Sequence, residues 1–133
     1  MEIKELLISE EFDIRVRILE AGEDLCVLLT GGDAPHIGAV SAGVYGAGVG
    51  AAHMTAEDEE ALAEPVHTYR FPAHRDDAMS RPLAIALSRN LKKNVVVLCG
   101  IHIDHLPKEK IQQIVDLLPE IEKKITALYQ TMC

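Results

Sequence analysis

Residues 95–101, which read Val-Val-Val-Leu-Cys-Gly-Ile, constrain the fold of this chain more than any other segment. Apolar and β-branched side chains are typical of a buried strand, and a glycine lets the backbone bend or approach another segment closely. His102, Asp104 and His105 follow directly. Titratable residues at the point where a strand becomes a loop are typical of binding and catalytic sites in sheet proteins. The sequence therefore predicts a buried strand that leads into a functional site.

The composition favours one domain with an aliphatic core. At 133 residues, the chain is long enough for a single domain, residues 1–133, whose core needs no disulfide or metal. Hydrophobic residues make up 48% and aromatic residues only 4%, so Val, Ile, Leu and Ala must build that core. With no tryptophan and a net charge of −8, the chain lacks the stacking surfaces and basic patches of nucleic-acid-binding proteins. We therefore predict no nucleic-acid partner.

The cysteines and the N-terminal residues favour a cytoplasmic location. Cys26 and Cys99 lie in apolar runs and Cys133 is the last residue, so this odd count without metal-ligand spacing predicts reduced thiols. The first residues lack the basic region and apolar core of a secretion signal, and no apolar run is long enough to span a bilayer. We expect a cytoplasmic protein that has no membrane partner.

The order of the predicted elements places strands first and helices late. Alternating or apolar runs predict strands at residues 12–18, 25–30, 39–45, 66–71 and 94–101, the first two as a hairpin. Leucines at every fourth position predict a helix within residues 76–91, in which Pro82 either causes a kink or lies in the first turn after a Ser80 cap. Pro119 divides residues 108–118 from 120–131 into a kinked helix or two consecutive helices. We predict an α+β fold, an α/β sandwich in which two or three helices pack on a mostly antiparallel sheet.

Two segments are expected to lie outside this sandwich. Residues 1–10 are interpreted as an N-terminal extension, and residues 46–64 as a flexible glycine-rich and acidic loop with room for one short helix. Residues 46–51 read Gly-Ala-Gly-Val-Gly-Ala, which formally fits the dinucleotide-binding pattern G-x-G-x-x-A. Because the chain opens with a hairpin rather than a βαβ unit, we predict no dinucleotide site there.

Histidines in three loops are the main candidates for a site. His36 follows a Gly-Gly-Asp loop, His74 closes a proline turn, and both would meet His102 at one end of the sheet. Three interpretations remain open: surface histidines without function, a metal site, or a site for a small anionic or flat ligand bound by glycine N–H groups, histidines and Arg75 or Arg81. No H-x-x-x-H pair is present, so we assign no metal ligand.

The remaining candidates have ordinary structural interpretations. Ser41 and Cys99 are the best-placed nucleophiles, but neither has the flanking residues of a nucleophile turn, so we assign no catalytic residue. Asp76-Asp77 is interpreted as helix capping and macrodipole chemistry. Arg15 and Arg17 share one face of a strand and are expected either to pair with acidic groups across the hairpin or to form an interface edge.

Three segments resemble signatures of one known family. They are residues 31–40, Gly-Gly-Asp-Ala-Pro-His-Ile-Gly-Ala-Val; residues 71–77, Phe-Pro-Ala-His-Arg-Asp-Asp; and residues 100–104, Gly-Ile-His-Ile-Asp. They are similar to those of the prenylated-flavin chaperone family, which are the small subunits of multicomponent hydroxyarylic-acid decarboxylases. That family is in turn similar in fold to proteasome-assembly chaperones. The resemblance covers about residues 10–130, and the glycine-rich and acidic insertion around residues 46–60 departs from the family pattern.

The resemblance implies a function as well as a fold. The family's large subunit is a UbiD-type decarboxylase that uses prenylated FMN, and the small subunit handles, delivers or helps to mature this flavin without being the catalyst. A homodimer of α/β sandwiches is also implied. Two alternatives stay open: an assembly chaperone that binds a partner protein through its loops without any small ligand, and a small histidine- or metal-dependent enzyme that acts on an anionic substrate.

The resemblance also implies a set of flavin-binding residues. Gly31 and Gly32 with Arg75 would supply donors for the flavin phosphate. The small residues within 39–43, which are Ala39, Ser41, Ala42 and Gly43, would form a wall for the flat ring system. Asp76 matches the family pattern but is not assigned to the site. The assigned residues are Gly31, Gly32, Pro35, His36, Gly38, Ser41, His74, Arg75, Gly100, His102 and Asp104.

Overall fold

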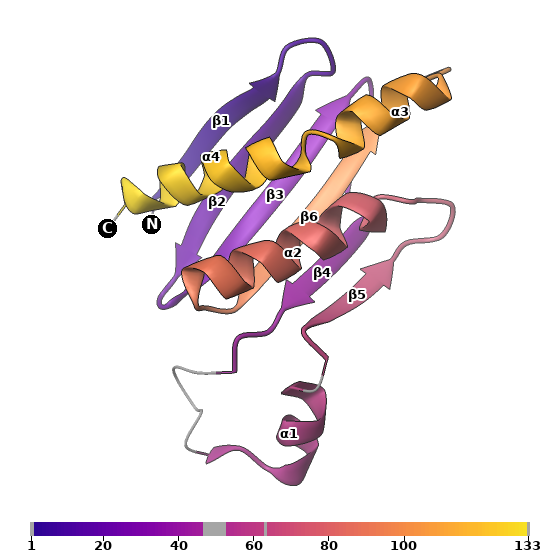
Figure 1. Cartoon of the computed structure of the whole chain (residues 1–133). Coiled ribbons are helices and arrows are strands. Elements are labelled where there is room, and N and C mark those ends of the chain that lie inside the picture. The colour runs from indigo at the N-terminus through magenta and orange to yellow at the C-terminus, as the bar shows by residue number, and fades with distance from the viewer. Residues whose placement is uncertain (1, 47–52, 63, 133) are drawn as a thin grey trace.

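A six-stranded sheet with helices on one face forms the structure, a computed structural model that describes residues 2–46, 53–62 and 64–132 (Figure 1). The strands lie in the order β1-β2-β3-β6-β4-β5, and only β3 and β6 run parallel. The predicted α+β fold with a mostly antiparallel sheet is therefore confirmed. In chain order the elements are β1 (Ile3–Ser9), β2 (Ile14–Ala21), β3 (Asp24–Gly32), β4 (Ala39–Gly43), α1 (Ala56–Leu62), β5 (Val66–Arg70), α2 (Asp77–Leu91), β6 (Val95–His102), α3 (Lys108–Val115) and α4 (Leu118–Gln130).

The core lies between the sheet and helices α2 and α4. These two helices contact each other and lie side by side across the same face of the sheet (Figure 1). The alternation along β2 explains why this face is buried, because Ile14, Val16 and Ile18 are fully buried while Arg15 and Arg17 point to the other face. Strand β6 follows the same rule, with Val95, Val97 and Cys99 buried against the helices.

Two prolines occupy different positions in their helices. Pro82 lies inside α2, five residues after its first residue, so the alternative in which Ser80 caps a helix that starts there is wrong. Asp76 occupies the N-cap position instead, and Ser80 is buried within the helix. Pro119 lies in the first turn of α4, where the missing N–H costs nothing, so the last segment forms two consecutive helices rather than one kinked helix.

The small residues of β4 make room for a helix. A Cβ atom on Gly43 would lie 2.3 Å from the Ala84 carbonyl oxygen, so the backbones of β4 and α2 are in direct contact. Ser41 is fully buried beneath the same helix, and its hydroxyl lies 2.8 Å from that of Ser80. The expected flavin wall of residues 39–43 is therefore wrong on this face, because α2 already covers it.

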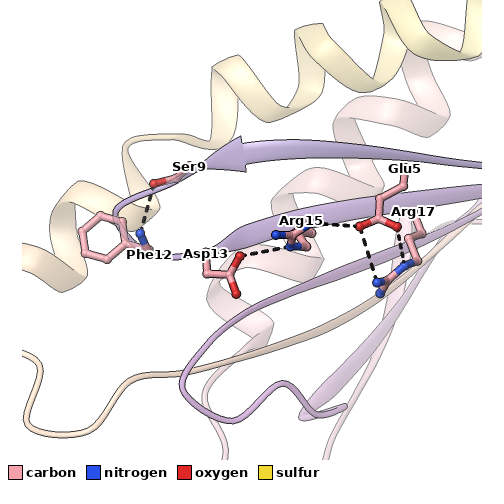
Figure 2. Close-up of polar contacts among 6 residues, drawn as sticks. All are labelled: Glu5, Ser9, Phe12, Asp13, Arg15 and Arg17. Carbon is pink, nitrogen blue, oxygen red and sulfur yellow. Dashed lines mark hydrogen bonds and ion pairs between the residues drawn. The ribbon is translucent and has the colours of Figure 1, made fainter.

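Residues 3–9 of the expected N-terminal extension form strand β1, which the sequence did not predict. This edge strand pairs with β2 in antiparallel register. On its outer face Glu5 accepts hydrogen bonds from Arg15 and Arg17, and Arg15 also donates to Asp13 (Figure 2). The predicted pairing of the two arginines with acidic groups is confirmed, although the main acid comes from β1 rather than from within the hairpin.

The expected loop at residues 46–64 is only partly described by the structure. Its described part contains the short helix α1 (Ala56–Leu62), which Thr55 and Asp58 begin with reciprocal side chain to backbone hydrogen bonds. The glycine-rich motif at residues 47–51 lies outside the described residues. No helix in the described ranges combines the length and apolar character that crossing a membrane requires.

Within the described residues, no helix covers the opposite face of the sheet (Figure 1). This face is rich in apolar side chains, and we call it the open face. Cross-strand register places Arg17, Leu28, Leu98 and Val40 in one row across four strands. These side chains are intermediate in burial, whereas their neighbours on the helix face are fully buried. The apolar members of the open face are Ile3, Leu7, Leu19, Cys26, Leu28, Val40, Ala42, Tyr69, Val96 and Leu98.

The contact between β4 and α2 predicts that Gly43→Ala destabilises the fold. The added methyl group meets a backbone carbonyl that cannot rotate away, so we expect a loss of about 1–3 kcal/mol in the free energy of unfolding. Urea denaturation followed by circular dichroism measures it. Ala42→Ser adds one atom on the open face and should change the free energy by less than about 0.5 kcal/mol. Equal midpoints for both variants would contradict the close contact.

The two cysteines described by the structure lie on opposite faces and predict different thiol reactivity. Cys99 is fully buried, and both burial and the nearby Asp76 charge raise its pKa; the pKa of the partly exposed Cys26 is raised by burial alone. Because the thiolate is the nucleophile, iodoacetamide should label Cys26 in dilute native protein at least about tenfold faster than Cys99. Mass spectrometry of the peptides reads each cysteine separately, and labelling in urea should equalise the rates.

Candidate functional site

Three loops converge at one end of the sheet, as predicted. His36 lies between β3 and β4, His74 precedes α2, and His102 is the last residue of β6. The rings of His36 and His74 are tilted by 33° with centroids 4.5 Å apart, and the centroid of His102 lies 6.4 Å from that of His36. Histidines separated by dozens of residues in the sequence therefore form one cluster.

The Asp76 carboxylate connects these loops. It is 9% exposed, and its Oδ1 accepts a hydrogen bond from the Ile101 N–H at 2.9 Å. Its Oδ2 lies 3.2 Å from His36 Nε2 and 4.0 Å from His74 Nδ1. The capping interpretation of this residue is only partly right: its backbone carbonyl accepts hydrogen bonds at the start of α2, but its side chain makes no cap bond and points into the histidine cluster.

The orientation of the His36 ring fixes which nitrogen carries hydrogen. Its Nδ1 lies 2.9 Å from the Ala34 carbonyl oxygen, which can only accept a hydrogen bond, so Nδ1 carries the hydrogen. Nε2 then points toward Asp76 Oδ2, which is within hydrogen-bond distance at 3.2 Å. By the same reasoning His102 Nε2 donates to Asp104 Oδ1 at 2.9 Å, which leaves its Nδ1 available to a ligand.

Two glycines allow these loops to approach each other. A Cβ atom on Gly100 would lie 1.7 Å from the His36 carbonyl oxygen, and one on Gly38 would lie 1.9 Å from Asp76 Oδ2. The Gly38 N–H also donates to the Cys99 carbonyl oxygen at 2.8 Å. Gly38 and Gly100 therefore position the His36 loop rather than bind a ligand through their own N–H groups.

A cavity of about 310 Å³ adjoins the cluster, and we call it the first cavity. Its polar lining residues are the three histidines with Arg75 and Asp76, and the exposed Arg75 has no ion-pair partner among the described residues. The other lining residues are apolar and come from α2 and the turn before it, the end of β6 and the segment after it, and α3. Its apolar residues are Ala73, Ala78, Met79, Ile101, Ile103, Leu106, Ile111, Ile114 and Val115.

A second cavity of about 480 Å³ lies on the other side of Ile103 and Leu106, which line both. Gly32 and Asp104 line this second cavity rather than the first. The Gly32 N–H already donates to the Phe12 carbonyl oxygen at 2.8 Å, so it is not available to a phosphate. The Asp104 N–H likewise donates to Asp33 Oδ2. The expected Gly31-Gly32 phosphate donors therefore do not face the histidine cluster.

The structure thus brings together part of the predicted set. His36, His74, Arg75 and His102 line the first cavity, with Gly38 and Gly100 directly behind them. Gly31 is buried against Ile14, Pro35 is exposed in its loop, and Ser41 lies beneath α2.

The sequence interpretation missed Asp76 and the apolar wall of the first cavity. A signal for the wall was present in α3, where Ile111, Ile114 and Val115 recur at helical spacing and place one apolar stripe on the cavity. Asp76 had a weaker signal, its match to the family pattern.

Comparison with known proteins assigns the chain to a family. A family model described as the prenylated flavin chaperone LpdD-like domain matches residues 8–130. The curated protein named Protein LpdD, from Lactiplantibacillus plantarum, is 28% identical over 110 residues, which cover 82% of this chain and 71% of that protein. The match to the family model includes all three loops of the histidine cluster. The chain therefore belongs to the prenylated flavin chaperone LpdD-like family.

Proposed function

We propose that this protein binds prenylated FMN in the first cavity and delivers it to a UbiD-type decarboxylase subunit, without being the catalyst. The observation that carries the proposal is the mixed lining of the cavity in a member of this family. Nine apolar residues line it together with three imidazoles and an arginine that has no ion-pair partner among the described residues. A ligand that has both an apolar ring system and a phosphate fits such a lining.

The apolar and the polar lining residues suit different parts of the flavin. Met79, Ile103 and Ile114 offer apolar contact to the tricyclic ring and its prenyl group. Arg75 supplies a planar fork of donors for the phosphate, which binds to guanidinium in a bidentate manner. At about 310 Å³ the cavity is near the lower end of ligand pockets, so part of the flavin would extend outside it. Partial exposure suits a protein that hands its ligand on.

The candidate nucleophiles support an accessory role. Cys99 is fully buried, and burial raises its pKa, which keeps it as the unreactive thiol. The Ser41 hydroxyl is buried between those of Thr68 and Ser80, at 2.9 and 2.8 Å. The free thiols of Cys26 and Cys99 also support the proposed cytoplasmic location.

Arg75→Ala should weaken flavin binding. A hydrogen bond to a charged group contributes about 1.5–3 kcal/mol, so we expect the Kd for prenylated FMN to rise roughly 10- to 150-fold. Isothermal titration calorimetry and quenching of flavin fluorescence measure it. Arg81→Ala is the matched control, because Arg81 is an exposed arginine of α2 that does not line the first cavity and should leave the Kd unchanged.

Three results would contradict the proposal or favour an alternative to it. Equal losses in both arginine variants would indicate a general charge effect rather than a phosphate site. No binding of FMN or prenylated FMN by the unaltered protein would contradict the flavin proposal. If a decarboxylase subunit were still captured in a pull-down without flavin, the alternative of an assembly chaperone that binds only protein would be favoured.

We also propose that two copies associate through the open face of the sheet. Its apolar side chains form a continuous strip across the strands, as expected for the centre of a homodimer interface. Each copy carries a net charge of −8, which opposes association in general. The open face avoids that repulsion, because its Glu5 is paired with Arg15 and Arg17. A second copy is therefore the partner that fits this face.

Val96→Lys should shift the protein toward monomer. Val96 is 37% exposed at the centre of the open face, so a charge there adds repulsion between copies and little strain within one. Light scattering after size exclusion measures the mass. Met54→Lys is the control, because Met54 is 42% exposed and lies outside the sheet. If the dimer forms through this face, labelling of Cys26 should also slow as protein concentration rises. An unchanged mass in Val96→Lys would contradict the proposed interface.

A further inference from the structure

We propose that His36, His74 and Asp76 bind one divalent transition-metal ion at the edge of the first cavity. One ligand atom from each of these residues lies within 4.8 Å of the other two. His36 comes from the loop after β3, whereas His74 and Asp76 come from the segment before α2. The proposal does not depend on the flavin, since it concerns the protein's own donor atoms.

The contact between His36 and Asp76 is the strongest argument for a cation. Nδ1 of His36 carries the hydrogen that bonds the Ala34 carbonyl, so the ring turns Nε2 toward Oδ2 of Asp76. The two atoms are 3.2 Å apart, which is close enough for the imidazole and the carboxylate to share one cation. Ligand atoms bound to one tetrahedral zinc ion at 2.0–2.1 Å lie about 3.3 Å apart, which agrees with this separation. A proton on Nε2 is the competing cation.

The surroundings orient both ligands as in metal sites. Metal-binding histidines commonly donate their second N–H to a backbone carbonyl, which is the bond that His36 makes to Ala34. Asp76 uses Oδ1 for the Ile101 N–H, which leaves Oδ2 for an ion. His74 completes the set after a small movement, because its Nδ1 is 4.0 Å from Oδ2 and its side chain is 37% exposed and therefore has room to rotate.

The donor set selects the class of metal. Two imidazoles and one carboxylate suit zinc and other divalent first-row ions, whereas calcium and magnesium prefer oxygen donors alone. Three protein ligands also leave at least one coordination position open. That position lies beside the first cavity, whose lining includes all three residues, so water or an oxygen atom of a bound molecule would complete the coordination.

Titration of tag-free, EDTA-treated full-length protein with ZnCl2 or CoCl2, in the absence of flavin, tests the site. We expect one ion per chain by calorimetry and visible absorption from bound cobalt. His74→Ala removes a partly exposed ligand and should weaken binding at least about tenfold, and His36→Ala should do the same. The control His53→Ala removes an exposed histidine outside the three-residue set and should retain the affinity of the unaltered protein.

The outcomes separate the metal from a proton and from the flavin. No binding of zinc or cobalt would overturn the proposal and leave a proton between His36 and Asp76. Equal losses in His74→Ala and His53→Ala would also overturn it, because the ion would then bind surface histidines in general. Metal binding without flavin binding would support this site and contradict the proposed function. Flavin binding without metal binding would contradict this site and support the proposed function.

Discussion

The buried carboxylate of Asp76 is the interaction on which the arrangement of the site depends. One oxygen bonds the backbone at the end of β6, the other meets the His36 loop, and the residue itself begins α2. A charge that is 9% exposed is costly unless its oxygens have partners. The contacts of both oxygens therefore hold three segments in one arrangement. This arrangement in turn sets the positions of the histidine side chains. Gly38 and Gly100 let the segments come close enough for this arrangement.

The two faces of the sheet have different roles. The helix face carries the core, and it leaves no space for a ligand at β4 because Gly43 contacts α2 directly. The site instead forms at the edge where β6 ends and α3 begins, as in other sheets whose ligands lie beyond strand ends. The open face is where we propose that a second copy associates. A dimer formed there would leave the first cavity accessible, because that cavity is lined from the helix side.

The proposed flavin and the proposed metal would use different residues of the same cavity. The flavin needs the apolar wall from α3 and the guanidinium of Arg75, whereas the metal needs only His36, His74 and Asp76. The open coordination position would face the ligand space. An oxygen atom of the flavin phosphate would be a suitable ligand there, since phosphate oxygens bind divalent ions and guanidinium alike. The two proposals are thus compatible but independent.

Five of the six strands, the approximate positions of the helices and the family resemblance could be predicted from the sequence, whereas the start of α2 and the break between α3 and α4 were left open. Period-two alternation and leucine spacing are local properties, so they can be recognised in the sequence without knowledge of the tertiary structure. It did not reveal β1, whose mixed pattern becomes a strand only when β2 supplies its hydrogen-bond partners. The sequence also predicted that the loops of His36, His74 and His102 meet, but the composition of the site depends on packing, which buries Ser41 and Gly31 and brings Asp76 to His36 from 40 residues away. Contacts across such separations depend on how the chain folds back, which no local spacing encodes.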